Sequence, residues 1–229
     1  MNQGSPGGAA RLTARRRPLG RRDQWVTWSA YAAFCALGLV SRAVPVAFLA
    51  FVAFGLAFPL WWGRRDPAAL GFTRRRLGQA LAWGAVAGIG WALYTYAAFR
   101  AGSSLPPFWP LQVVIGLPVW LLILSPFQEF FFRGWFQPRL QLALGHWPGL
   151  VVTAVAFTAW HAFPPLEGTP TATLPLSSLL GIVSTVGLGL LLGYVYQRTE
   201  TIAAPWLAHA LGGIGLVLIG QMVFLRYVP

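Results

Sequence analysis

The sequence predicts an all-α, polytopic membrane helix bundle with seven or eight transmembrane helices. Hydrophobic residues make up 56% of the 229 residues, charged residues make up 10%, and the mean hydropathy is +0.60. A soluble domain is far less apolar than this. The apolar runs are continuous and long enough for helices to cross a bilayer, which takes about 17 to 25 residues. A transmembrane barrel would instead alternate polar and apolar residues over about ten positions.

Seven apolar runs have the length of a membrane span, and an eighth span stays open. The runs are Trp25–Ser41, Ala43–Gly63, Gln79–Phe99, Leu111–Phe132, Trp147–Phe163, Leu176–Gln197 and Ile202–Leu225. Residues 1–24, rich in Arg, Gly and Pro, are expected to form a disordered basic arm on the cytoplasmic side. Residues 25–229 are expected to form one membrane-embedded domain, since no internal repeat divides them.

The net charge of +12 comes from arginine, because the chain has seventeen Lys and Arg residues, all of them Arg, and five acidic residues. The arginines cluster before the first span and between the second and third spans, where the positive-inside rule places cytoplasmic segments. This pattern indicates a membrane orientation and argues against nucleic-acid binding. We expect a cytoplasmic N-terminus, in a membrane such as the bacterial inner membrane, and, with seven spans, a C-terminus on the opposite side.

Ionisable groups inside the predicted spans are few, and they mark the candidate site. Glu129 is the one acidic residue there, and Arg133 follows it one helical turn later. A carboxylate in hydrocarbon costs about 2.5 to 3.5 kcal/mol on insertion scales, so such groups favour function. The alternative is that Glu129 and Arg133 only neutralise one another at i,i+4 spacing. Another is that Arg133 reaches to the cytoplasmic surface.

Two histidines shift the balance toward a functional site. His161 and His209 lie in two other apolar spans, so three helices each carry one group suited to proton transfer. Glu129 and His161 lie sixteen positions before and after Gly145. In a helical hairpin turning at Gly145, both side chains would then lie about 24 Å from the turn and at one level. His209 fits this count less well, and the side on which a cavity opens stays undetermined.

Three sequence motifs resemble those of a known family. The segments are Gln128-Glu129-Phe-Phe-Phe-Arg133-Gly, Phe157-Thr-Ala-Trp-His161 and His209-Ala-Leu-Gly-Gly213. In order and spacing they are similar to the motifs of the CPBP intramembrane proteases, which include the type II CAAX prenyl endopeptidases and the Abi proteins. The resemblance extends over residues 111–225.

This resemblance implies an intramembrane endopeptidase that hydrolyses a peptide bond in a membrane-anchored or lipidated substrate. Glu129, His161, His209 and Arg133 are the catalytic candidates, with glutamate and histidine activating water. Two positions differ from the family pattern. Gln128 replaces the first Glu of the pair, which usually activates the water, and Gly213 replaces an Asn or Asp that could hold an oxyanion. Glu129 would then take over as the base, one position and about 100° around the helix.

Other functions and a metal site remain alternatives. His161, His209 and Glu129 could form a zinc set, but the HExxH helix of many zinc peptidases is missing from the sequence. We therefore favour no cofactor. A catalytically degenerate relative would act as a membrane peptide-binding, immunity or chaperone protein. A proton-coupled transporter is less favoured because repeated halves are not evident.

Overall fold

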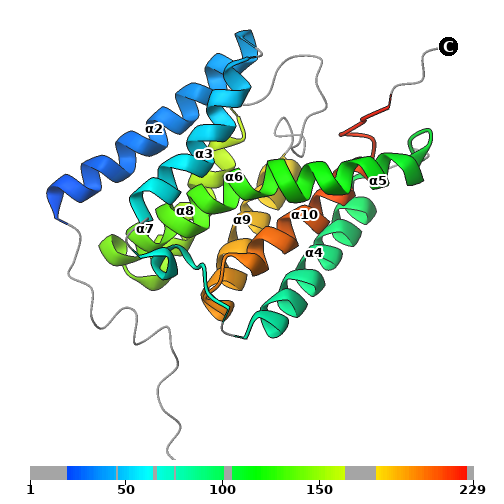
Figure 1. The fold of residues 1–229 in the computed structure, drawn as a ribbon. Coiled ribbons are helices and arrows are strands. Elements are labelled where there is room, and N and C mark those ends of the chain that lie inside the picture. The colour runs from blue at the N-terminus through cyan, green and yellow to red at the C-terminus, as the bar shows by residue number, and fades with distance from the viewer. Residues whose placement is uncertain are drawn as a thin grey trace, which may run out of the picture.

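The computed structural model describes residues 20–44, 46–63, 66–74, 76–100, 105–162 and 179–225, and it confirms the all-helical prediction for these residues (Figure 1). The elements are α2 (Arg21–Ala43), α3 (Ala47–Gly63), a 3-10 turn η1 (Pro67–Leu70), α4 (Leu77–Phe99), α5 (Trp109–Val119), η2 (Trp120–Leu124), α6 (Ser125–Glu129), η3 (Phe130–Phe136), α7 (Gln137–Leu144), α8 (His146–Trp160), α9 (Leu179–Thr199) and α10 (Ala203–Leu218). Helix α2 begins at Arg21, so the last residues of the predicted arm are helical, and residues 1–19 lie outside the described part.

Residues Trp109 to Leu144 form one uninterrupted helix, so the described residues contain seven long helices in all. Two of these helices, Trp109–Leu144 and Leu179–Thr199, are long and apolar enough to cross a membrane by length and hydropathy alone. Ala47–Gly63 and Ala203–Leu218 are shorter apolar helices. Each long helix overlaps one predicted span, and the longest one extends past its span at both ends.

Apolar and polar side chains are distributed as expected for a protein in lipid. Large apolar side chains are exposed along the outer faces of the helices, among them Leu49, Val86, Ile89, Leu93, Val114, Leu122, Val155 and Val183. The interior holds many polar side chains, including Gln112, Ser125, Gln128, Glu129, Arg133, Gln137, Thr153, Thr158, His161 and His209. Such an exposed apolar surface would be unstable in water. The chain is an integral membrane protein, and its polar groups are gathered in the bundle interior.

The long helix contains two π-helical segments, and each ends two residues before a proline. Segment η2 ends at Leu124 before Pro126, and η3 ends at Phe136 before Pro138. At both ends the backbone makes an i to i−5 bond, from Ser125 N–H to the Trp120 carbonyl and from Gln137 N–H to the Phe132 carbonyl. Proline lacks an N–H and crowds the preceding turn, and a locally wider helix accommodates it. The wider turns flank the five residues of α6, which end at Glu129.

The predicted hairpin is present between α7 and α8. Gly145 connects them with a φ of +93°, a conformation that favours glycine. Ring contacts across the hairpin pair Phe132 with Phe157, at a centroid distance of 5.1 Å, and Phe127 with Trp160, at 6.1 Å. The first pair lies almost symmetrically about Gly145 in the sequence, and the second pair is offset by about one helical turn. This register places Glu129 and His161 at similar depth.

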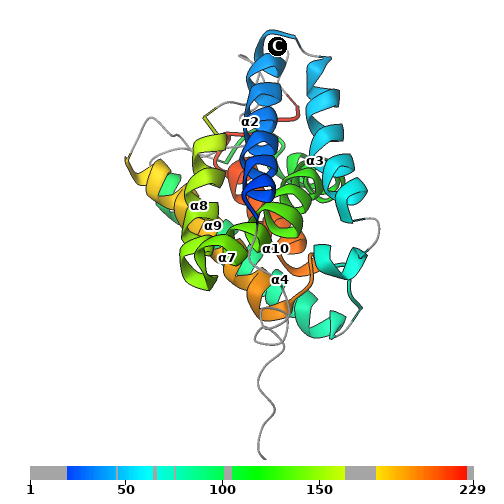
Figure 2. The same cartoon turned by 90° about the vertical axis from the view of Figure 1, so that its left-hand side faces the viewer.

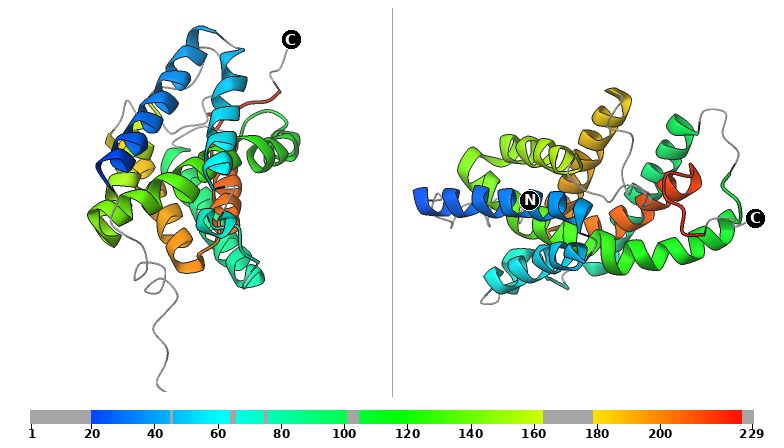
Figure 3. Two further views of the ribbon diagram at one scale, coloured as in Figure 1. Left: turned by 60° about the vertical axis from the view of Figure 1, so that its left-hand side comes forward. Right: turned by 90° about the horizontal axis from the view of Figure 1, so that it is seen from above.

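Helix α10 packs most extensively against α4, and α8 packs against both α7 and α9. Figure 2 shows α2 and α3 side by side as an antiparallel pair. Figure 3 shows the long helix extending between the α4–α10 pair and the α7–α8 hairpin. The long helix therefore contacts both halves of the bundle and can carry a site that both halves complete.

Candidate active site

Glu129 and Arg133 form a buried ion pair on the long helix. Both side chains are fully buried. The Nε of Arg133 lies 3.3 Å from Oε2 of Glu129, and Nη1 of Arg133 donates to Oε1 at 3.4 Å. The Nε contact lacks hydrogen-bond geometry, so Nη1 makes the directed bond. Arg133 therefore does not reach the surface, and the pair is an internal feature of the bundle.

A third residue, His209 of α10, contacts the carboxylate of this ion pair. Its Nδ1 lies 2.6 Å from Oε1 of Glu129. An ionised Glu129 carboxylate can only accept hydrogen bonds. The Nδ1 atom must then carry the proton and donate it, which leaves Nε2 of a neutral imidazole as an acceptor. A carboxylate that fixes a histidine tautomer in this way orients the ring for proton transfer at Nε2.

Helix α9 holds the guanidinium in place from the other side. Nη2 of Arg133 donates to the carbonyl of Gly189 at 3.0 Å, and the Nε2 of Gln137 donates to the carbonyl of Gly193 at 3.2 Å. A methyl group at Gly189 would lie 2.9 Å from the Cα of Ala154 in α8. The absence of a side chain thus lets α9 approach closely enough for its carbonyls to be reached.

His161 directly follows the last residue of α8, and the ring of Phe157 lies between it and the Glu129 cluster. Its Nδ1 lies 2.7 Å from the carbonyl of Phe157. A carbonyl accepts only, so this nitrogen also carries the proton, and Nε2 is again the free acceptor in the neutral ring. The Phe157 ring lies 4.3 Å from the His161 ring and 5.9 Å from the His209 ring. The Arg133 guanidinium carbon lies 4.5 Å from its centroid, so Phe157 contacts three of the four predicted catalytic residues.

Gln128 and Gly213, the two positions that depart from the family pattern, are both buried beside this cluster. The Oε1 of Gln128 has no hydrogen-bond partner among the described residues. At Gly213 an added Cβ would overlap the indole ring of Trp120. The space that a side chain at 213 would occupy is therefore filled by Trp120, whose ring centroid lies 5.5 Å from that of His209.

The donor set does not form a preassembled zinc site. In the described part of the chain, no three His, Cys, Asp or Glu side chains are placed together to hold a metal ion. The Glu129 carboxylate already interacts with Arg133 and His209, and the Nδ1 atoms of both histidines are used by other acceptors.

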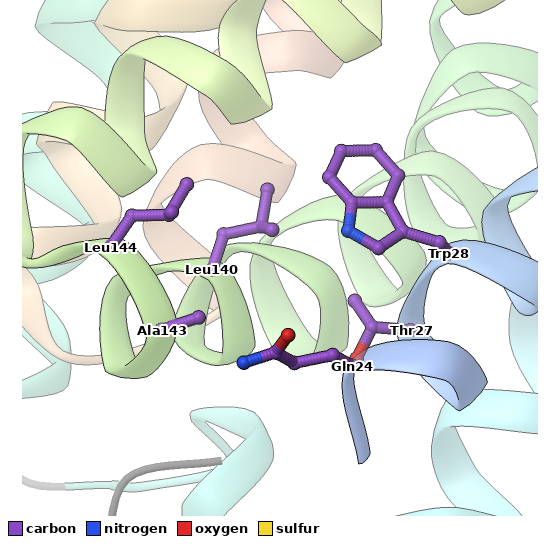
Figure 4. Close-up of a pocket in the computed structure, with 6 residues that line it drawn as sticks. All are labelled: Gln24, Thr27, Trp28, Leu140, Ala143 and Leu144. Carbon is purple, nitrogen blue, oxygen red and sulfur yellow. The ribbon is translucent and has the colours of Figure 1, made fainter. Parts of the chain in front are cut away.

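A separate surface pocket lies between α2 and α7 (Figure 4). Gln24, Thr27, Trp28, Leu140, Ala143 and Leu144 line it. None of these is a predicted site residue, and the pocket carries no pair of titratable groups.

Sequence reasoning identified the charged residues of the cluster but missed two of its neutral ones. Gly189 contributes a backbone carbonyl, which every residue has. Its only signal in the sequence is the small-xxx-small spacing with Gly193, which is typical of closely packed membrane helices. Trp120 lies nine residues before Glu129 and belongs to no motif. The glycine at 213 was a possible signal that a large side chain packs there.

A bundle that encloses a glutamate, an arginine and two histidines within an apolar surface defines an integral membrane protein with an interior acid–histidine centre. Residues 109–214 match the model of a family described as type II CAAX prenyl endopeptidase, Rce1-like. The matched segment is slightly less than half of the chain, and the match confirms the resemblance seen in the motifs. Neither the curated proteins nor the solved structures gave a match to the chain.

Proposed function

We propose that this protein is an intramembrane endopeptidase that hydrolyses a peptide bond of a membrane-anchored or lipidated protein. The observation that carries the proposal is the 2.6 Å contact between Glu129 and Nδ1 of His209, buried among apolar helices. The match to a CAAX prenyl endopeptidase family supports the reaction type and a prenylated or otherwise membrane-associated substrate.

In the proposed reaction, glutamate and histidine activate water together. Glu129 holds His209 with Nε2 free, and Nε2 takes a proton from water as the water oxygen bonds to the peptide carbonyl carbon. The carbonyl oxygen becomes an oxyanion. The proton then passes to the peptide nitrogen, the C–N bond breaks, and a carboxylic acid and an amine leave. His161, with its own Nε2 free, is the second candidate for carrying the proton.

This assignment gives Glu129 an orienting role, because both of its oxygens face Arg133 or His209. The sequence suggested that Glu129 would replace the missing carboxylate at Gln128 as the direct base. The geometry instead supports the imidazole as the proton acceptor. A neutral amide at position 128 is compatible with this assignment, since a second carboxylate there would repel the first.

The test is cleavage of lipidated and unlipidated versions of one C-terminal peptide by the purified protein in lipid nanodiscs. We expect cleavage of the lipidated peptide and a loss of at least about a hundredfold in kcat for Glu129→Gln and His209→Ala. His161→Ala is expected to lower kcat as well. The substitution Asp23→Asn is the control, because Asp23 pairs with Arg139 at the surface of the bundle, away from the proposed site.

Full activity in the Glu129 and His209 variants would show that the active site lies elsewhere. Binding of the peptide without cleavage by the parent protein would instead favour a degenerate, peptide-binding relative. Metal analysis of the active preparation tests the expectation that no cofactor is needed. Zinc at one atom per chain, with activity lost on chelation and restored by zinc, would overturn that expectation.

A further inference from the structure

The Trp120 indole N–H is a buried hydrogen-bond donor beside the acid–histidine pair. Trp120 is 1% exposed, and its Nε1 has no hydrogen-bond partner among the described residues. A buried donor left unpaired is unfavourable, because it loses its hydrogen bond to water and gains none in return. Its ring neighbour is His209, at 5.5 Å between centroids. The unpaired donor therefore belongs to the ring that lies beside the proposed base.

The indole position depends on Gly213, which lies on α10 one turn after His209. An added Cβ at 213 would overlap ring carbons of Trp120, including Cε2, which is bonded to Nε1. The glycine and the tryptophan therefore form a matched pair, because the first supplies the space that the second fills. Any side chain at 213 would displace the ring, and with it the N–H, from its place beside His209.

Hydrolysis of an amide creates an oxyanion, and this centre needs a hydrogen-bond donor to stabilise it. His209 donates Nδ1–H to Glu129, and His161 donates Nδ1–H to the carbonyl of Phe157. In their neutral forms neither ring has a second N–H. Arg133 is engaged by Glu129 and the Gly189 carbonyl. The N–H of Trp120 is free of such an engagement.

Trp160 and Trp135 also have buried indole N–H groups without partners in the described residues, but their surroundings differ. The Trp160 ring is stacked on Phe34, at 5.2 Å and 6°, and lies 4.6 Å from the ring of His161, the second candidate for carrying the proton. Trp135 lies between Phe58, Phe131 and Trp62. Trp120 is the one whose ring lies against His209, the proposed base.

We propose that Trp120 is a further catalytic residue, whose Nε1–H donates a hydrogen bond to the carbonyl oxygen of the scissile peptide and to the oxyanion formed from it. This rests on the proposed peptidase function. Removing one donor of this kind costs about a hundred- to a thousandfold in kcat in enzymes that depend on it. Because the bond strengthens as charge develops, the effect falls on kcat and leaves KM nearly unchanged.

The experiment compares Trp120→Phe with Trp135→Phe by steady-state kinetics on the lipidated peptide. Both variants remove a buried indole with an unpaired N–H, so they lose similar packing. We expect kcat to fall at least about tenfold more in Trp120→Phe than in Trp135→Phe, with KM within about twofold of the parent value.

A second variant supplies a donor in another way. Trp120→Ala combined with Gly213→Asn removes the overlapping ring and places an amide in the vacated space. We expect this double variant to cleave at least about tenfold faster than Trp120→Ala alone.

Equal kcat in Trp120→Phe and Trp135→Phe, with an active parent, would overturn the role of Trp120 and leave the peptidase proposal standing. A parent protein that cleaves neither peptide would overturn both. A tenfold rise in KM at unchanged kcat would also reject the proposal, because it would indicate uniform binding rather than stabilisation of the oxyanion.

Discussion

Arg133 connects three parts of the site. Its guanidinium contacts Glu129, the Gly189 carbonyl and the face of the Phe157 ring. A planar guanidinium can serve these three partners at once because its N–H groups point in fixed, divergent directions. A lysine ammonium is a point charge and cannot replace this geometry.

The substitution Arg133→Lys should therefore lower both stability and activity. We expect the free energy of unfolding to fall by about 1 to 3 kcal/mol, because a hydrogen bond from a charged group is lost and a buried acceptor is left without a donor. Denaturation of the purified protein in detergent measures the change. Arg139→Lys, six residues further along the same helix, is the matched control. A loss at Arg139 equal to that at Arg133 would contradict the prediction, because Arg139 pairs with a partly exposed Asp23.

Gly213 should be intolerant of even a methyl group. Gly213→Ala would drive its Cβ into the Trp120 ring, and overpacking of this kind costs about 1 to 3 kcal/mol. Gly90→Ala, in α4, is the control, because an added Cβ there meets no atom within 4 Å. That change should be neutral or stabilising by up to about 1 kcal/mol, since alanine favours helix. Thermal unfolding of both variants in detergent checks the difference, and similar melting temperatures would refute it.

At the scale of the helices, the glycines of α9 control the approach of three elements. Gly189 lies against Ala154 of α8 and offers its carbonyl to Arg133 of the long helix. Four residues later, Gly193 does the same with Leu150 and Gln137. The same two glycines therefore determine how closely α9 packs against α8 and how the side chains of Arg133 and Gln137 are held.

The substitution Gly189→Ala should separate α9 from α8 and weaken the bond from Arg133. Its Cβ would lie 2.9 Å from backbone Cα of Ala154, an atom that cannot move by a rotamer change. We expect a loss of about 1 to 3 kcal/mol in stability, together with reduced peptidase activity. Gly187→Ala, two residues earlier, is the control, because its Cβ would make an ordinary 3.6 Å contact with Trp91. Activity that is unaffected at Gly189 would show that Arg133 does not depend on α9.

Much of the helix arrangement could be predicted from the sequence, for physical reasons. Span positions could be predicted from hydropathy. In lipid, backbone N–H and C=O groups can bond only to one another, so a span is a continuous apolar helix. The hairpin register followed from Gly145 and helix rise. The π-helical segments before Pro126 and Pro138 did not follow, since proline predicts a disturbance without giving its form. Nor did the pairing of Glu129 with His209, because which helices meet depends on packing that hydropathy does not encode.

At the scale of the whole molecule, different contacts hold the helices together at the two ends of the bundle. The backbone N–H of Ile202, in the α9–α10 link, donates to the carbonyl of Gly71, so this link lies beside the α3–α4 link. At the opposite end, the Gln112 side chain bonds to Phe224 and Leu225, which joins the start of α5 to the C-terminal segment. Figure 1 shows these two groups of links at opposite ends of the bundle. The end with the α3–α4 link carries the arginines that predict the cytoplasmic side.

The proposed orientation can be tested by labelling single cysteines with a membrane-impermeant maleimide in intact cells. Cys35 is buried in α2 and is first replaced by alanine. We expect Leu105→Cys, before α5, to react from outside, and Ala68→Cys, in η1, to react only after the membrane is opened. The reverse pattern would show a periplasmic N-terminal side.

The hydrogen bond from Arg133 to the Gly189 carbonyl of α9 also has a consequence for the assembly of the protein during synthesis. The long helix precedes α9 and α10 in the chain, so it is synthesised first, and its carboxylate and guanidinium then have one another as the nearest partner on their own helix. The later arrival of α9 and α10 brings the Gly189 carbonyl and His209 into contact with that pair. The proposed active centre is therefore completed last, so a nascent chain would remain inert until its bundle has closed.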